Sequence, residues 1–311
     1  MTTTAAGTAV GIDVGGTKCL GVALGADGGV LAEHRVPTPN DPDELIGTLA
    51  SITKELGATE AVGICVPGLV TRDGVLLAAP NLTSAQMLPV RERLEQATGL
   101  RVHVDNDNTV ACLAEWKLGA GRGVDDLVLV GLGTGIGGGF VSGGVLQRGH
   151  HGFAGEFGHM IVDIDGVPCP CGQRGCWERY ASGSGLAYLA RRAASDGLLE
   201  EILERVGSVD GIRGEHITTG AKEGDRQALA VVDVYAGWVA LGLVNLTNLF
   251  DPGVIVLSGG LSADPEIFLS PIEHSYARRL FGNELRPRPD LRFAELGPHA
   301  GAIGAALLTI E

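Results

Sequence analysis

The stretch Gly131-Leu132-Gly133-Thr134-Gly135-Ile136-Gly137-Gly138-Gly139 separates two apolar runs, and a shorter stretch of the same kind, Asp13-Val14-Gly15-Gly16-Thr17-Lys18, stands near the N-terminus. Each is followed by an apolar run and then by the same four residues, Gly-Gly-Val-Leu, at 28–31 and 143–146. This repetition indicates an internal duplication. It predicts two related α/β halves that face each other across a cleft, with one glycine turn on each wall.

Short apolar runs alternate with stretches of helical periodicity along the rest of the chain. Runs that end at glycine, proline or acidic residues predict strands at 8–12, 19–24, 30–36, 61–66, 101–104, 126–131, 140–142, 145–146, 254–257 and 291–296. Apolar residues three or four positions apart predict helices at 43–56, 91–98, 185–194, 197–206, 226–250 and 301–310, and one of about ten residues from Thr109. The alternation predicts a mixed α/β fold.

The composition is that of a folded, acidic protein. Glycine accounts for 49 of 311 residues, about twice the usual share of roughly 7%. The mean hydropathy of +0.21 argues against low-complexity disorder. The formal charge is −14, without a cluster of lysine and arginine, so we do not expect binding to nucleic acid.

Three features predict the compartment. Residues 1–10 have neither the basic nor the apolar region of a signal peptide. Residues 127–146 are uncharged, but eight of these twenty residues are glycine, so the stretch is interpreted as strand, turn and strand and not as a membrane span. Cys19, Cys65 and Cys112 stand singly in apolar surroundings, which fits a reduced cytoplasm better than a disulfide framework.

A compact set of metal ligands follows the second turn. One imidazole and three thiols occur within 18 positions, in Glu156-x-x-His159 and Cys169-x-Cys171-x4-Cys176-x-Glu178. They form a complete ligand set for tetrahedral zinc, and because no position is left open, the ion is expected to be structural. His159 could bind zinc through one ring nitrogen and point the other toward a ligand. Glu156 and Glu178 flank the set, so the zinc loop lies beside carboxylates that could hold a polar ligand.

The glycine turns suit phosphate binding, because glycine lets a phosphate approach free backbone N–H groups. Asp13, at the end of a strand, could hold Mg²⁺ through water, although this first turn could also be purely structural. Gly133, Gly135 and Gly138 match the dinucleotide pattern G-x-G-x-x-G, but that site requires a helix next, and 140–146 has the pattern of a strand. We therefore reject a Rossmann fold. Ser258-Gly259-Gly260 could contact a nucleotide or be only a turn.

The stretch Asp105-Asn106-Asp107-Asn108 begins a predicted helix. Aspartate and asparagine favour the N-cap, but four such residues exceed what one cap needs. The remaining carboxylates and amides could hold a polyol. A carboxylate at this place could also accept a hydroxyl proton during phosphoryl transfer.

Together and in this order, these motifs resemble the ROK family (repressor, open reading frame, kinase), and closely its bacterial glucokinases. The resemblance extends over residues 8–310. It implies the two-domain actin-like ATPase/hexokinase fold. The smaller α/β domain would comprise residues 1–107 and 299–311, and the larger α/β domain, with the zinc motif, residues 108–298.

The resemblance also implies a reaction: transfer of the ATP γ-phosphoryl group to the 6-hydroxyl of glucose, with Asp107 as general base. The sugar would be bound by Asn106, Asp107, Glu156, His159 and Glu178, with Gly68 and Asn81 as further contacts. ATP and Mg²⁺ would be bound near Asp13, Gly15, Gly16, Thr17, Lys18, Gly133, Thr134, Gly135, Gly259 and Gly260. Structural zinc would be held by His159, Cys169, Cys171 and Cys176.

Several alternatives stay open from the residues alone. The sugar could be mannose, N-acetylmannosamine, N-acetylglucosamine or fructose, and the phosphoryl donor could be polyphosphate. A sugar-sensing repressor would need a helix-turn-helix segment, and only seven residues precede Thr8. A non-catalytic sugar-binding module would not need Asp13, Thr17, Thr134 and Asp107 together. The family suggests a dimer or tetramer.

Overall fold

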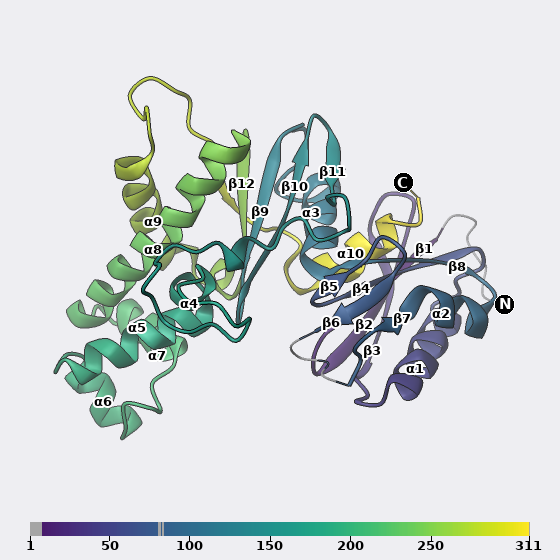
Figure 1. The fold of residues 1–311 in the computed structure, drawn as a ribbon, viewed down its shortest axis with the longest axis horizontal. Coiled ribbons are helices and arrows are strands. Elements are labelled where there is room, and N and C mark those ends of the chain that lie inside the picture. The colour runs from purple at the N-terminus through teal and green to yellow at the C-terminus, as the bar shows by residue number, and fades with distance from the viewer. Residues whose placement is uncertain (1–7, 80–81, 83, 311) are drawn as a thin grey trace. The chain divides into compact units, whose positions relative to one another are not determined.

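The computed structural model describes residues 8–79, 82 and 84–310 (Figure 1). Asn81 and most of the segment tested for a signal peptide lie outside these residues. The chain forms two compact units. Unit 1 comprises Met1–Val124, Gly139–Gly155 and Glu295–Glu311, and unit 2 comprises Asp125–Gly138 and Glu156–Ala294.

The first five-stranded sheet has the order β3-β2-β1-β4-β8. The first three strands of the chain form an antiparallel meander, and β4 and β8 continue the sheet parallel to β1. Their bounds are β1 (Ala9–Val14), β2 (Lys18–Leu24), β3 (Val30–Pro37), β4 (Ala61–Val66) and β8 (Arg101–Asn106). A smaller sheet of β5 (Leu69–Val70), β6 (Val75–Ala78) and β7 (Leu88–Pro89) was not predicted, because its strands are too short for a periodic pattern.

Four helices accompany this sheet: α1 (Pro42–Glu55), α2 (Val90–Thr98), α3 (Asp107–Leu118) and α10 (Ala300–Leu307). Helix α1 begins where the Asp41 side chain accepts the N–H groups of Asp43 and Glu44, as an N-cap should. Helix α10 lies directly on the sheet (Figure 1). A side chain at Gly11 would place its Cβ 2.1 Å from the nitrogen of Ala306. Glycine therefore permits this close contact.

The second sheet has the equivalent order, β11-β10-β9-β12-β13. Again a meander comes first, and two strands parallel to its first strand follow. The bounds are β9 (Leu127–Leu132), β10 (Ile136–Ser142), β11 (Val145–Gln147), β12 (Val254–Gly259) and β13 (Asp290–Phe293). The matching strand orders confirm the predicted duplication of α/β halves.

The second glycine turn is shorter than predicted. It comprises only 133–135, because β10 already begins at Ile136. Gly138 lies inside that strand, where a Cβ would come within 2.4 Å of the Phe157 ring and 2.6 Å of the Leu129 carbonyl oxygen. Packing, and not a turn, requires glycine there. A strand after the turn also confirms that this is not a dinucleotide-binding Rossmann motif.

Unit 2 also contains the helices α4 (Glu178–Ala181), α5 (Gly183–Ser195), α6 (Glu200–Val206), α7 (Gly214–Lys222), α8 (Arg226–Phe250) and α9 (Pro265–Arg279). Helix α8 was predicted with the correct bounds. By length and composition alone it could cross a membrane, and 56% of its most apolar window is buried within the protein. Helices α7 and α9 were missed, because α7 is short and polar and α9 contains Pro271.

Candidate functional site

The predicted base lies where a strand of unit 1 ends and a helix begins. Strand β8 ends at Asn106, and Asp107 is the first residue of α3. The Oδ1 atom of Asn106 accepts the N–H groups of Asn108 and Thr109 at 2.9 and 3.1 Å. Its Nδ2 group donates to the Gly68 carbonyl oxygen at 3.0 Å. Asn106 is thus the helix N-cap, and it brings Gly68 to the start of α3.

The Asp107 carboxylate is oriented by its neighbour in sequence. Its Oδ1 atom accepts the backbone N–H of Asn108 at 2.8 Å and the Nδ2 group of the same residue at 2.9 Å. These two hydrogen bonds fix the direction of one carboxylate oxygen. The carboxylate lies in the first turn of the helix, where the helix dipole favours negative charge.

The first glycine turn is exposed at Gly16, Thr17 and Lys18, whereas Asp13 beside it is half-buried. The Cys65 thiol donates to Asp13 Oδ1 at 3.3 Å. Burial raises the pKa of Asp13, although the Cys65 hydrogen bond and the charge of Lys18 act in the opposite direction. A nearby divalent cation would favour the charged form of this carboxylate, so Asp13 suits the Mg²⁺ role expected for it.

Three of the predicted nucleotide contacts line one cavity in unit 2. Gly133 and Thr134 line the same cavity as Gly260, with a volume of about 770 Å³. Gly259 lies against the turn as well, because a Cβ there would be 2.4 Å from the Leu132 carbonyl oxygen. Several polar residues of this cavity were not predicted, since most belong to α7 and its surroundings. They are Ser184, Arg191, Arg213, Glu215, Thr218, Thr219, Lys222 and Asp264.

The four predicted zinc ligands converge in unit 2. One ligand atom from each of His159, Cys169, Cys171 and Cys176 lies within 4.8 Å of all the others. The Sγ atoms of Cys171 and Cys176 are 3.6 Å apart. Two thiolates on a tetrahedral zinc, with Zn–S bonds of about 2.3 Å, would be separated by about 3.8 Å. The donor set therefore fits zinc in both chemistry and spacing.

The loop that carries these ligands requires glycine. Gly175 has φ 68°, and a Cβ at this residue would lie 1.6 Å from the Asp163 carbonyl oxygen. The backbone N–H of Cys169 donates to the Gln173 carbonyl oxygen at 2.8 Å, which closes a turn that contains Cys171. The ligand positions are thus set by a tight backbone as well as by side chains.

Three polar side chains meet beside the zinc ligands. The His159 ring lies between two carboxylates, with Nε2 3.8 Å from Glu156 Oε2 and Nδ1 4.0 Å from Glu178 Oε1. Glu178 also accepts the Cys169 thiol at 3.1 Å. Burial raises the pKa of Glu156; His159 lowers it and Glu178 raises it further. A Cβ at Gly135 would lie 2.6 Å from Glu178 Oε2, so Glu178 touches the second glycine turn.

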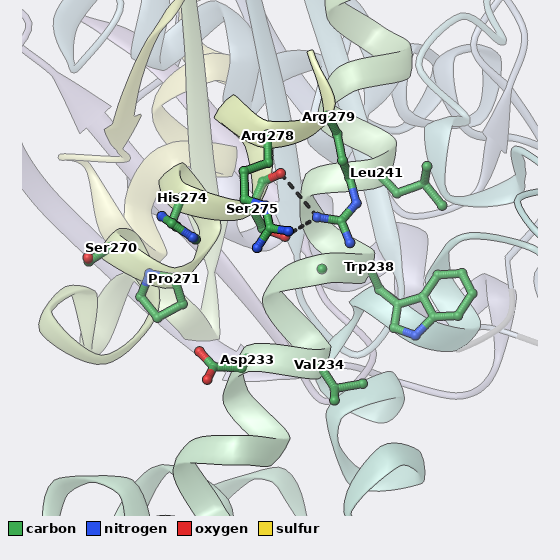
Figure 2. A pocket seen from close by; sticks show the side chains of 11 residues that line it. Asp233, Val234, Trp238, Leu241, Ser270, Pro271, His274, Ser275, Arg278 and Arg279 are labelled. Carbon is green, nitrogen blue, oxygen red and sulfur yellow. Dashed lines mark hydrogen bonds between the residues drawn. The ribbon is translucent and has the colours of Figure 1, made fainter.

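A second cavity of unit 2 is a separate feature. It has a volume of about 950 Å³ and lies between α8 and α9, with Asp233 and Trp238 on one side and His274 and Arg278 on the other (Figure 2). Arg279 is held there by the carbonyl and hydroxyl oxygens of Ser275. No predicted site residue lines this cavity. This cavity is therefore separate from the predicted active site, although its volume would accommodate a ligand.

Each unit thus carries part of the predicted site. Unit 1 holds the first glycine turn with Gly68, Asn106 and Asp107, and unit 2 holds the second turn, the zinc ligands and the three polar side chains.

Known proteins and one protein-family model resemble this chain over almost its whole length. A model of the ROK family matches residues 9–311. A glucokinase from Streptomyces coelicolor is 40% identical, over 98% of this chain and 98% of that protein. An N-acetyl-D-glucosamine kinase from Pectobacterium atrosepticum is 36% identical, over 96% and 97%. The structure of a ROK family glucokinase from Streptomyces griseus, in complex with glucose and AMPPNP, superposes with a TM-score of 0.85 at 39% identity, covering 97% and 99%.

Proposed function

The chain belongs to the ROK family, and we propose that it transfers the γ-phosphoryl group of ATP to the 6-hydroxyl of glucose, giving glucose 6-phosphate and ADP. The observation that carries the proposal is the full-length likeness to the Streptomyces griseus glucokinase that was solved with glucose and AMPPNP. The two glycine turns, the carboxylate at the start of α3 and the polar side chains beside the zinc ligands support the same reaction.

Asp107 is the proposed general base. Its Oδ1 atom is held by the backbone N–H and the side chain of Asn108, so the carboxylate is oriented before a substrate binds. The transition state of phosphoryl transfer is loose, so a base of this kind mainly orients the attacking hydroxyl and takes its proton late. The phosphorus–oxygen bond to ADP breaks as the bond to the sugar oxygen forms.

The sugar hydroxyls are proposed to bind to Asn106, Glu156, His159 and Glu178. Carboxylate oxygens accept hydrogen bonds from hydroxyls, and an imidazole can donate or accept. Gly68 contributes through its backbone, which already contacts Asn106, and Asn81 is kept as a further contact. Because Glu178 also touches Gly135, the sugar side and the phosphate side of unit 2 share one residue.

The phosphates are proposed to lie along the two glycine turns, with Asp13 as the Mg²⁺-associated carboxylate. Their contacts are Gly15, Gly16, Thr17, Lys18, Gly133, Thr134 and Gly135. The cavity that contains Thr134 and Gly260 would take the adenosine, with Gly259 beside it. When bound, Mg²⁺ would offset the negative charge that the phosphates carry and develop. Backbone N–H groups of the two glycine turns would also stabilise this negative charge by donating hydrogen bonds to the phosphate oxygens.

Structural zinc is proposed at His159, Cys169, Cys171 and Cys176. Four protein ligands leave the ion no position for a substrate. When bound, zinc would fix the loop that leads to Glu178 and the ring of His159, so these side chains would meet the sugar in a defined orientation.

The decisive experiment measures Mg²⁺–ATP-dependent ADP release over a panel of sugars, with Asp107→Asn as the mutant. We expect turnover with glucose far above that with fructose or the aminosugars, and its loss in Asp107→Asn with glucose binding retained. Equal loss of glucose binding would make Asp107 a sugar ligand and not the base. Absence of ADP release with every sugar would refute the proposed reaction with ATP and direct the test to polyphosphate.

An aminosugar is the second candidate substrate, because an N-acetyl-D-glucosamine kinase is 36% identical over nearly the full chain. The same panel of sugars decides between glucose and an aminosugar.

We further propose a cytoplasmic homo-oligomer, a dimer or tetramer, that acts without nucleic acid or membrane. Light scattering of the purified protein would test the oligomeric state.

A further inference from the structure

A partly buried ion pair adjoins the segment that carries the proposed base. Asp105 lies on β8, two residues before Asp107, and only 7% of its surface is exposed. Its Oδ2 atom is 2.6 Å from Nε of Arg148. Its other oxygen, Oδ1, accepts the backbone N–H of Asn106 at 2.9 Å. One carboxylate thus contacts both the turn that carries the base and a residue from a distant part of unit 1.

Arg148 begins a loop, residues 148–155, that is held on its other side by a second arginine. The Nε and Nη2 groups of Arg72 both donate to the carbonyl oxygen of Gly149, at 2.9 and 2.6 Å. The backbone N–H of Arg72 donates to the His151 carbonyl oxygen at 3.3 Å. The loop therefore has fixed backbone contacts in addition to the ion pair.

The same loop lies against the short strands that follow Gly68. Gly152 has φ 103°, and a Cβ there would lie 2.6 Å from the Val70 carbonyl oxygen. Gly68 in turn accepts the Asn106 side chain. The base-bearing turn is thus connected to the loop twice, through Asp105 and Arg148 and through the backbone around Gly68. The loop ends at the residue before Glu156.

We propose that Arg148 is a positioning residue for phosphoryl transfer. Through Asp105 it fixes the turn that presents Asp107, within unit 1. The inference rests on the proposed function, because that proposal assigns Asp107 as the base. Displacing a reacting group by about 1 Å can cost a factor of about 10² in rate, which is why a residue that touches no substrate can control turnover.

A purely stabilising ion pair would behave differently. Removing one partner would leave the other charge buried and lower the stability, but the folded fraction would keep its turnover number. A positioning role lowers kcat in protein that is fully folded and leaves the Michaelis constant for ATP unchanged.

The experiment compares Arg148→Lys, Arg148→Met, Asp105→Asn and the double variant Asp105→Asn/Arg148→Met in the full chain. For each, kcat and the Michaelis constants for glucose and ATP are measured well below its melting temperature. The double variant removes both charges, so it avoids the orphaned carboxylate of Arg148→Met. Arg205→Met is the control: it breaks the exposed ion pair with Glu223, of 2.8 Å, in unit 2.

We expect kcat to fall by about tenfold to a hundredfold in Arg148→Met, with partial recovery in Arg148→Lys and wild-type turnover in Arg205→Met. The double variant should be no slower than the slower single variant, because both act through one contact. Unchanged kcat in the folded single variants, or multiplicative losses in the double variant, would overturn the inference. A wild-type protein that phosphorylates no sugar would instead refute the proposed function, so the two failures are distinct.

Discussion

At the scale of single residues, Glu115 on α3 is a buried carboxylate outside the predicted site. It is completely buried, and its carboxyl oxygens accept three backbone N–H groups. They belong to Ala120 at 2.9 Å, Glu295 at 3.1 Å and Leu296 at 2.9 Å. Glu115 therefore ties the end of α3 to the segment that leads into α10.

We expect Glu115→Ala to lower the free energy of unfolding by about 3 kcal/mol or more, since it leaves three buried donors without their acceptor. Urea unfolding followed by circular dichroism measures the change. The matched control is Glu95→Ala, because the exposed Glu95 accepts a single N–H, that of Val102 at 3.2 Å. The control should change the free energy by less than about 1 kcal/mol, and equal effects would contradict the prediction.

His103 provides a pH-dependent contribution to stability. Burial lowers its pKa below the usual value of 6.5, and the charges of Arg91 and Arg101 lower it further. The unfolded chain therefore binds a proton at a higher pH than the folded protein does. This contribution to stability is fully present above the unfolded pKa and is lost as the pH falls through the folded pKa.

We expect His103→Gln to flatten the loss of stability between about pH 7 and about pH 5, where an ordinary histidine titrates. Unfolding midpoints in urea across this range measure the slope for both proteins. Parallel slopes would mean that His103 does not contribute to the pH dependence.

At the scale of elements, the contact between α10 and the first sheet depends on glycine. A Cβ at Gly63 would lie 1.7 Å from the carbonyl oxygen of Ala305. Gly63→Ala should lower the free energy of unfolding by about 3 kcal/mol or more, because two backbones would have to separate. Gly47→Ala is the control: Gly47 lies in α1 with nothing within 4 Å of its Cβ position. It should be stabilising by about 0.5–1 kcal/mol, as denaturant unfolding can test.

The cysteine loop contains little regular structure, so its order should depend on the ion. We expect stoichiometric zinc by elemental analysis, and a lower melting temperature after treatment with a strong chelator, because binding free energy is available only to the folded loop. Cys176→Ser should lose the zinc, whereas Cys19→Ala should retain it. Metal-free protein with an unchanged melting temperature would show that the loop needs no ion.

Periodicity predicted the long elements and missed the short ones. Helix α8 and the first meander were correct because their apolar residues repeat over many positions. Helix α7 and strands β5–β7 were not predicted. Because most of the polar residues that line the cavity at Thr134 lie on or near α7, these residues were not predicted as part of the site either. The metal ligands were found because their spacing is specific within 18 positions. Contacts such as Glu115 with Leu296 depend on tertiary packing, which no local pattern encodes.

At the scale of the whole molecule, duplication was the most reliable signal in the sequence. Two glycine turns and two Gly-Gly-Val-Leu segments predicted two related α/β halves, and the structure contains two five-stranded sheets with equivalent strand orders. The residue-by-residue roles at the site stay predictions, as does the domain division after Asp107. The roles of the site residues depend on contacts with bound sugar, nucleotide and metal, and the spacing of residues along the chain does not give the positions of these ligands.

The position of α10 has a consequence for how this protein is made. The strands that contain Gly11 and Gly63 are synthesised before the whole of unit 2, whereas the helix that packs on these glycines is synthesised after it. Until then the apolar face of the first sheet has no partner from α10. During translation, the nascent chain is therefore open to aggregation and to chaperone binding, and a chain that stops before α10 could not complete its first unit.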